Sequence, residues 1–177
     1  MDGAADPRSS DLGVSEASQP QDLPPEQAAR RRWMSVLAKA GLAELEQAMP
    51  AVRETLGELP AYRLIRRPEI GMAMVRARAG GTGRAFNLGE MTMTRCTLRT
   101  EQGLVGTSYV AGRSQRHAEL AALLDALLQD PARQAQVLAL VVDPLARAQE
   151  LRRNRRVERS APTRVDFFTV VRGEDNL

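Results

Sequence analysis

The first third of the chain consists of a polar leader followed by two helical patterns of apolar residues. Residues 1–25 contain almost no large apolar side chain, so we expect a disordered leader there. A helical period then covers residues 26–40, opened by a proline at a favourable first position and closed by a glycine. A second helical period covers residues 42–59, and Pro50 predicts either a kink or a break within it.

Beyond residue 60 the pattern changes to short apolar runs separated by glycine. Such runs are typical of antiparallel strands, and a short glycine-containing loop over residues 101–103 has the length of a hairpin turn. The predicted strands cover residues 62–67, 70–79, 91–101 and 104–111.

Helical patterns return in the last third of the chain. Ser114 is a good N-cap for a helix with one apolar stripe that closes near Asp130. Asp130 and Asp143 each precede a proline, which predicts the starts of two further helices. Residues 152–159 have lost nearly all large apolar positions, and we expect a solvated link there.

An apolar run near the end of the chain has strong strand composition. It either completes the chain's own sheet or adds to a partner's sheet, because an exposed strand this apolar would invite aggregation. The predicted partner-binding residues are Val165, Phe167, Phe168 and Val170. The predicted architecture is one α+β domain over residues 26–177, with a mainly antiparallel sheet, helices at both ends and a C-terminal arm over residues 163–177.

Composition favours a protein that works with partners. At 177 residues the chain fits one domain, and 43% hydrophobic with 27% charged residues excludes a wholly disordered chain. Aromatic residues make up only 3%, which predicts a light core and marginal stability without a partner. All but one of the 25 basic residues are arginines, but the net charge is only +3, so no nucleic-acid partner is expected.

Single copies of cysteine and histidine limit the possible chemistry. One cysteine excludes an internal disulfide, and one histidine with it excludes a self-contained Cys/His zinc site, so no metal is expected. No apolar run approaches 18 residues and no signal peptide is recognisable. A cytoplasmic location without membrane insertion is the resulting expectation.

The most glycine-dense point of the chain lies between two predicted strands. Gly80, Gly81 and Gly83 free several backbone N–H groups that can cradle an anion, with Arg78 and Arg84 on either side. The segment lacks the Lys-Ser/Thr ending of a P-loop and does not open a helix. The alternative is a tight turn, for which glycine is the usual residue.

Arginines on neighbouring predicted strands form a second candidate site. Period-two alternation puts Arg76 with Arg78, and Arg95 with Arg99, on common faces. If they converge with Arg84 and Arg113 they form an anion patch fit for a polyphosphate. The alternative is a set of solvated or interface arginines.

His117 and Cys96 are the remaining candidates for chemistry. His117 lies in the first turn of its predicted helix on the apolar stripe, which suits a neutral imidazole. It is a candidate general acid or base near Glu119, and the alternative is a half-buried histidine satisfied by a backbone group. Cys96 is more typical of a small core residue than of a nucleophile.

Several short motifs lie in order along the chain: Arg32–Leu37, Gly80–Gly83, Thr94–Arg95, Gly112–Arg113, His117–Glu119, Asp125–Leu127, Arg164–Thr169 and Val171–Gly173. Together they resemble one family, PhnG, a small subunit of the bacterial carbon-phosphorus lyase core complex. The resemblance runs from Arg32 to Gly173, and its most specific element lies at the C-terminal end.

The resemblance implies a role in using phosphonates as a phosphorus source. Subunits called PhnG, PhnH, PhnI and PhnJ are expected to pair about a two-fold axis, and the complex attaches a phosphonate to ribose C1 of ATP with release of adenine. PhnI is regarded as the nucleosidase centre and PhnJ cleaves the carbon-phosphorus bond. ATP and the phosphonate are then substrates of the complex, and this chain alone is expected to bind no cofactor and to lack catalysis of its own.

Two other classes of function remain as alternatives. A stand-alone small phosphotransferase or hydrolase would use His117, Glu119 and the glycine turn. A basic nucleic-acid-binding module would show steep salt dependence, but the mixture of acidic and basic residues makes it the weakest hypothesis. The favoured hypothesis is an assisting subunit of a phosphonate-processing transferase complex.

Overall fold

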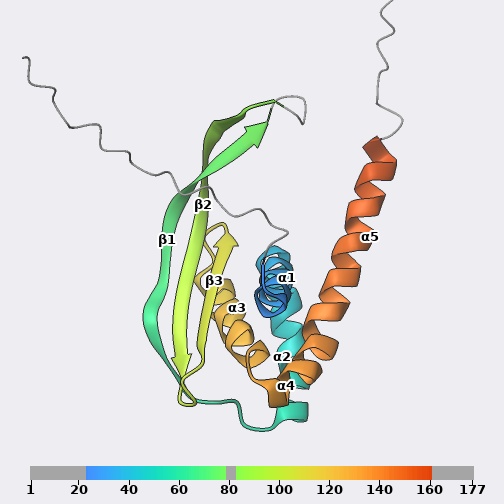
Figure 1. The fold of residues 1–177 in the computed structure, drawn as a ribbon. Helices are drawn as coiled ribbons and strands as arrows, with labels where there is room; N and C mark the ends of the chain where they lie inside the picture. Colours follow the sequence, from blue (N-terminus) through green and yellow to red (C-terminus); the bar gives the residue numbers. More distant parts are fainter. Residues whose placement is uncertain (1–22, 79–82, 161–177) are drawn as a thin grey trace, which may run out of the picture.

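The computed structural model describes residues 23–78 and 83–160, which combine helices with an antiparallel sheet in an α+β fold (Figure 1). The expected fold class is confirmed. The elements in chain order are α1 (Pro25–Lys39), α2 (Leu42–Leu56), β1 (Tyr62–Arg78), β2 (Ala85–Thr100), β3 (Val105–Ala111), α3 (Gln115–Leu128), α4 (Pro131–Val137), a π-helical turn η1 (Leu138–Val142) and α5 (Asp143–Ser160).

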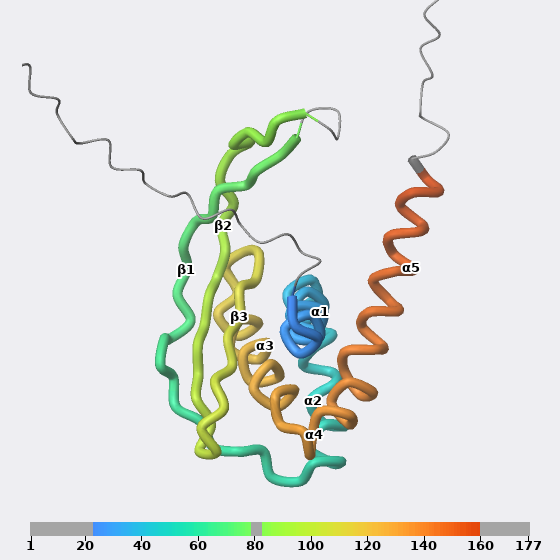
Figure 2. Tube along the Cα trace, viewed as in Figure 1, coloured from blue at the N-terminus to red at the C-terminus, as the bar shows by residue number. Residues whose placement is uncertain are grey.

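The sheet is an antiparallel meander in the order β1-β2-β3. β1 and β2 pair over almost their whole lengths, from Tyr62 opposite Thr100 to Arg78 opposite Ala85. The shorter β3 pairs only with residues 93–99 of β2. Residues 72–78 of β1 and 85–92 of β2 therefore continue past β3 as a two-stranded ribbon, called the arm below, which Figure 2 shows projecting beyond the helices.

β1 is one long strand where the sequence predicted two. The expected break between residues 67 and 70 is instead a pair of register shifts, between Leu64 and Arg66 and between Arg66 and Glu69. Pro68 lies inside this irregular stretch. Proline lacks the N–H that a central strand needs, but an edge strand with a bulge tolerates it.

Helix α3 is the centre of the core. It packs on β2 and β3 with one face and against α1, α2 and α4 with others, so most of its side chains are buried. Ser114 caps it as predicted, its Oγ accepting a hydrogen bond from the backbone N–H of His117 at 3.2 Å. Gly106 of β3 lets the helix approach closely, because an added Cβ there would stand 1.9 Å from the backbone oxygen of Ala122.

The two N-terminal helices agree with the expected boundaries to within a few residues. α1 begins with Pro25 in its first turn, and the chain turns at Gly41 into α2. Pro50 lies inside α2, which continues through it to Leu56, so the helix is not broken there. Val52, two residues after that proline, is fully buried, and packing of this kind offsets the hydrogen bond that the proline removes.

Of the two N-caps predicted in the C-terminal third, one is confirmed and one is wrong. Asp130 does cap α4, accepting a hydrogen bond from the N–H of Ala132 at 3.0 Å. α5 does begin at Asp143, as predicted, but Asp143 has helical backbone angles and is not an N-cap, because η1 joins α4 to α5 without interruption. The wider π turn gives the ring of Pro144 room that a regular turn denies it.

The expected solvated link over residues 152–159 is helical. These side chains are exposed as predicted, but they form the outer turns of α5. The inner turns anchor the helix, since Leu145 is buried and the Gln149 side-chain amide donates to the carbonyl of Val36 at 2.9 Å. Among the described helices, none is long and apolar enough to cross a membrane.

Candidate functional site

The arginines that the sequence singled out do not gather in one patch. Arg78 and Arg84 lie at the tip of the arm, where Arg78 pairs with Ala85. Arg95 lies ten residues further along β2, about 33 Å away at roughly 3.3 Å per residue. Arg113 follows the end of β3, near the middle of the sheet. The convergence of these arginines on one anion is therefore wrong for the isolated chain.

Arg95 is already paired with a carboxylate. Its guanidinium and that of Arg66 both bind the Oε1 atom of Glu69 on the exposed edge of β1. Hydrogen bonds from these two arginines hold the pKa of Glu69 below its ordinary value. Binding of a substrate anion by Arg95 would have to compete with this pair.

The glycine-rich segment follows β1 and precedes β2 in the chain. Gly80 and Gly81 are outside the described residues, so their proposed anion cradle stays a prediction. Gly83 is described, and its carbonyl accepts a hydrogen bond from Arg78 Nη1 at 3.3 Å. Arg84 is exposed beside it. Within the described residues the segment forms one end of a hairpin rather than the start of a helix.

His117 is a buried link between two helices. Its Nε2 atom lies 2.9 Å from the carbonyl oxygen of Leu37, and because a carbonyl can only accept, this nitrogen donates. The ring is 6% exposed. This is the backbone-satisfied histidine that the sequence left as an alternative, and its burial gives it no open path to a substrate within this chain.

Glu119 and Cys96 also have structural partners. Glu119 Oε1 accepts a hydrogen bond from the Tyr62 hydroxyl at 2.7 Å. Burial, together with this bond to a carboxylate, raises the pKa of Tyr62 to about 12. Cys96 is fully buried on the inner face of β2, and burial raises the pKa of its thiol to about 11. A buried protonated thiol is a poor nucleophile, which matches the expected core role.

A buried polar cluster around Asp125 escaped the sequence analysis. This carboxylate, 0% exposed on α3, accepts hydrogen bonds from Trp33 Nε1 at 2.9 Å, Arg30 Nη2 at 2.7 Å and the backbone N–H of Thr107 at 2.9 Å. It therefore joins α1, α3 and β3. The only sequence signal was that Trp33 and Asp125 both fall in the motifs of the family resemblance.

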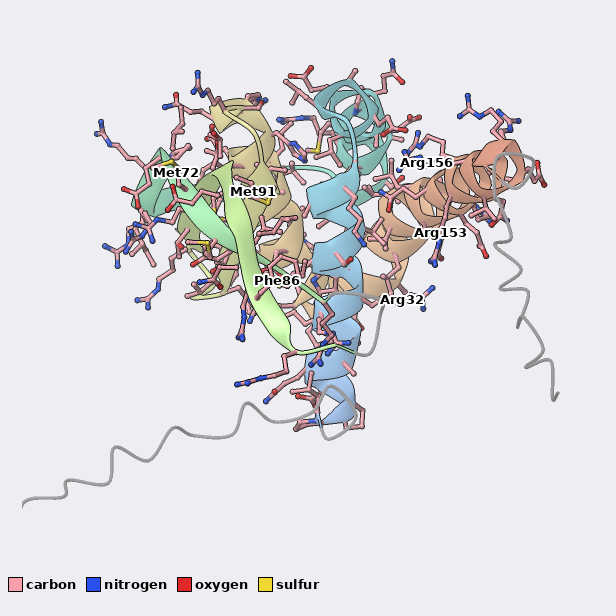
Figure 3. All side chains as sticks on the ribbon, turned by 90° about the horizontal axis from the view of Figure 1, so that it is seen from above. Arg32, Met72, Phe86, Met91, Arg153 and Arg156 are labelled. Carbon is pink, nitrogen blue, oxygen red and sulfur yellow. The ribbon has the colours of Figure 1, made fainter. Side chains whose placement is uncertain are left out.

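The arm exposes large apolar side chains on both of its faces. Residues directly opposite share a face of a strand pair and neighbours along a strand alternate. Met72 lies opposite Thr92, whereas Met91 lies opposite Ala73, so the two methionines project from opposite faces (Figure 3). Met72 is 70% exposed and Leu88 64%. The exposed apolar residues of the arm are Met72, Met74, Phe86, Leu88 and Met91.

No cluster of three or more potential metal ligands exists among the described residues. The C-terminal candidates Val165, Phe167, Phe168 and Val170 lie outside the described residues, so their contact with a partner stays a prediction. A groove of about 680 Å³ lies between α1 and β3 on the described surface. The arm is thus the strongest candidate for an interaction surface.

Comparison with known proteins decides the family. The model of the family described as phosphonate metabolism protein PhnG matches residues 28–173. The chain belongs to the PhnG family. It is also 45% identical over 148 residues to the alpha-D-ribose 1-methylphosphonate 5-triphosphate synthase subunit PhnG of Rhizobium meliloti (strain 1021), covering 84% of this chain and 92% of that protein.

Membership of the PhnG family bears directly on the hypotheses from sequence. The resemblance stated from short motifs is confirmed, and so is a role in phosphonate metabolism. Neither alternative, a stand-alone hydrolase or a nucleic-acid-binding module, gains support. The arm and the Asp125 cluster both lie within the stretch that matches PhnG, whereas residues 1–27 lie outside it.

Proposed function

We propose that this chain is an assisting subunit of a phosphonate ribosyl triphosphate synthase complex. The complex transfers a phosphonate to ribose C1 of ATP and releases adenine, and its other members are PhnH, PhnI and PhnJ in a two-fold hetero-oligomer in the cytoplasm. ATP and the phosphonate are substrates of the whole complex, and this chain brings no cofactor. The synthase subunit named in the similar protein of Rhizobium meliloti supports this proposal.

The observation that carries the proposal is the arm. An isolated two-stranded ribbon is marginally stable in water, and this one shows five large apolar side chains to solvent. Exposed apolar patches of this kind mark protein interaction sites. Because apolar side chains project from both faces of the arm, a partner that covers only one face would leave the apolar side chains of the other face exposed to solvent. A partner subunit therefore encloses the arm from two sides.

The role assigned to the chain is structural support of a site built elsewhere. Among the described residues, His117, Glu119 and Cys96 are all engaged within the fold. Among the candidate arginines, Arg78 and Arg84 lie together at the tip of the arm, far from Arg95 on β2. A complete nucleophile, base and anion clamp is not assembled from the described residues, which favours catalysis on partner chains.

Omission of this chain tests the proposal. The three partner subunits are purified with and without the chain, and adenine release from ATP plus methylphosphonate is measured. We expect activity only when the chain is present. Equal adenine release without it would contradict the assisting role, and release by the isolated chain would return attention to His117 and the glycine turn.

Substitutions on the arm test the docking surface. Met72→Gln with Met91→Gln keeps side-chain length but replaces one apolar group on each face. Each loses about 1 to 2 kcal/mol of burial, so together they should weaken assembly on the order of a hundredfold. Leu151→Gln is the matched control, because Leu151 is 58% exposed on α5. Assembly unaffected by the arm pair, or weakened equally by the control, would contradict this surface.

A further inference from the structure

Three arginines form a basic face where α1 meets α5. Arg32 lies one turn before Val36 on α1, and Val36 accepts the hydrogen bond that joins the two helices. Its donor, Gln149, is followed one and two turns later on the same side of α5 by Arg153 and Arg156. Figure 3 shows Arg32 beside α1 on the side of α5, and Arg153 and Arg156 along α5.

Within the described residues, the three arginines of the basic face take part in no ion pair. Arg32, Arg153 and Arg156 are all exposed. Nearby, Arg152 is different because Glu44 binds it at 2.7 Å. Residues 151–159 hold five arginines and one glutamate, so the outer end of α5 is strongly positive.

The leader carries negative charge that could balance the positive charge of the basic face. Residues 1–22 contain five acidic residues and one arginine. The leader enters the described structure at Leu23, just before α1 begins, and Arg32 is about 10 Å from that end of the helix at roughly 1.5 Å per residue. The path from Pro25 along α1 to Val36, and from Gln149 along α5 to Arg156, is roughly 27 Å of helix. A chain of 22 residues spans up to about 70 Å when extended, so it can reach the outer turns of α5.

We propose that the acidic part of the leader, residues 1–22, binds the basic face formed by Arg32, Arg153 and Arg156. Covalent attachment to α1 gives the leader a high local concentration beside this face, on the order of millimolar. The association is electrostatic and multivalent, and it is weakened by salt. The leader lies outside the stretch that matches PhnG, so this contact is an addition to the shared fold.

The breadth of the face favours a segment of chain over a small anion. Its arginines are spread over two helices and two turns of α5, and a small anion needs convergent donors in a concave site. The leader also competes with any acidic surface of a partner chain for the same arginines. Occupation of the face by the leader would therefore select among partners by their charge.

A paramagnetic label on the leader tests the proposal in the isolated full chain. Ser15→Cys introduces the attachment point, and the buried thiol of Cys96, with its pKa raised to about 11, does not react under the same conditions. Backbone amide signals of residues 152–159 are then compared at about 20 mM and about 500 mM salt. We expect strong broadening at low salt that falls at least about threefold at high salt.

Charge reversal identifies the face. Arg153→Glu with Arg156→Glu should abolish the low-salt broadening. Arg63→Glu with Arg99→Glu, an exposed pair directly opposite each other on the sheet, makes the same change in net charge and should leave it intact. The proposal is overturned if α5 shows no broadening at low salt, which leaves the face to an acidic partner, or if both variants behave alike. The salt series needs no substitution in the face, and neither result depends on the synthase partners.

Discussion

The hydrogen bonds and ion pair of the buried Asp125 carboxylate should contribute strongly to the free energy of unfolding. Asp125→Asn keeps the size of the side chain but replaces one oxygen with an NH₂ group. One carboxylate oxygen accepts hydrogen bonds from Trp33 and Arg30, and the other accepts from Arg30, Thr107 and Gln129. In either orientation of the asparagine amide, its NH₂ group would therefore face N–H donors and lose those hydrogen bonds. Breaking a buried ion pair from one side costs about 3 to 5 kcal/mol.

The structure places the expected loss at the lower end of that range. Arg30 is 36% exposed at its side chain and can be resolvated, whereas the carboxylate is wholly buried. A loss of about 3 kcal/mol is a large fraction of a typical folding stability of roughly 5 to 15 kcal/mol. Trp33, the only tryptophan, is buried beside Asp125 and reports the transition.

Urea unfolding, followed by tryptophan fluorescence and by far-ultraviolet circular dichroism, measures this loss. Arg152→Gln is the control, because it breaks the exposed pair with Glu44 and should cost at most about 1 kcal/mol. A loss for Asp125→Asn below about 1 kcal/mol, or no larger than that of the control, would refute the assignment of this cluster as the joint between the helices and the sheet.

Two further predictions follow from close contacts. Gly106→Ala should destabilise the fold by about 3 kcal/mol because its Cβ meets the backbone of α3, whereas Gly71→Ala has open space and should change stability by at most about 1 kcal/mol; urea midpoints decide, and similar values for both would refute the packing. In a Tyr109→Phe background, absorbance titration should show the phenol of Tyr62 ionising near pH 12, shifted toward 10 by Glu119→Gln. The raised pKa means that the stabilisation from Tyr62 is complete below pH 10 and is lost as the pH rises to about 12; a midpoint near 10 in the folded chain would contradict it.

Local signals predicted most of the elements but not where they meet. The proline at α1, the Ser114 cap and the Asp130 cap are local features, and all three lie where expected. Asp143 gave the same local signal as Asp130, but the helix runs through it because burial of Val141 and Val142 holds η1 in place. Capping residues alone do not distinguish these two outcomes.

The candidate site was less predictable because its contacts are distant in sequence. The hydrogen-bond partner of His117 is the carbonyl of Leu37, 80 residues away in the sequence. No local sequence pattern around either residue predicts this hydrogen bond. Strand alternation alone placed Arg78 and Arg95 on faces, but the register of β1 on β2 separates them. Exposure of the arm depends on the short length of β3, which ends pairing at Met93.

The mass of the assembly tests the central claim most directly. The chain is expressed alone and with the three partner subunits, and light scattering gives the mass of each preparation. The account predicts a stable hetero-oligomer that contains the chain, and its loss when Met72→Gln and Met91→Gln are combined. A monomer that remains separate from all three partners would contradict both the subunit role and the docking of the arm.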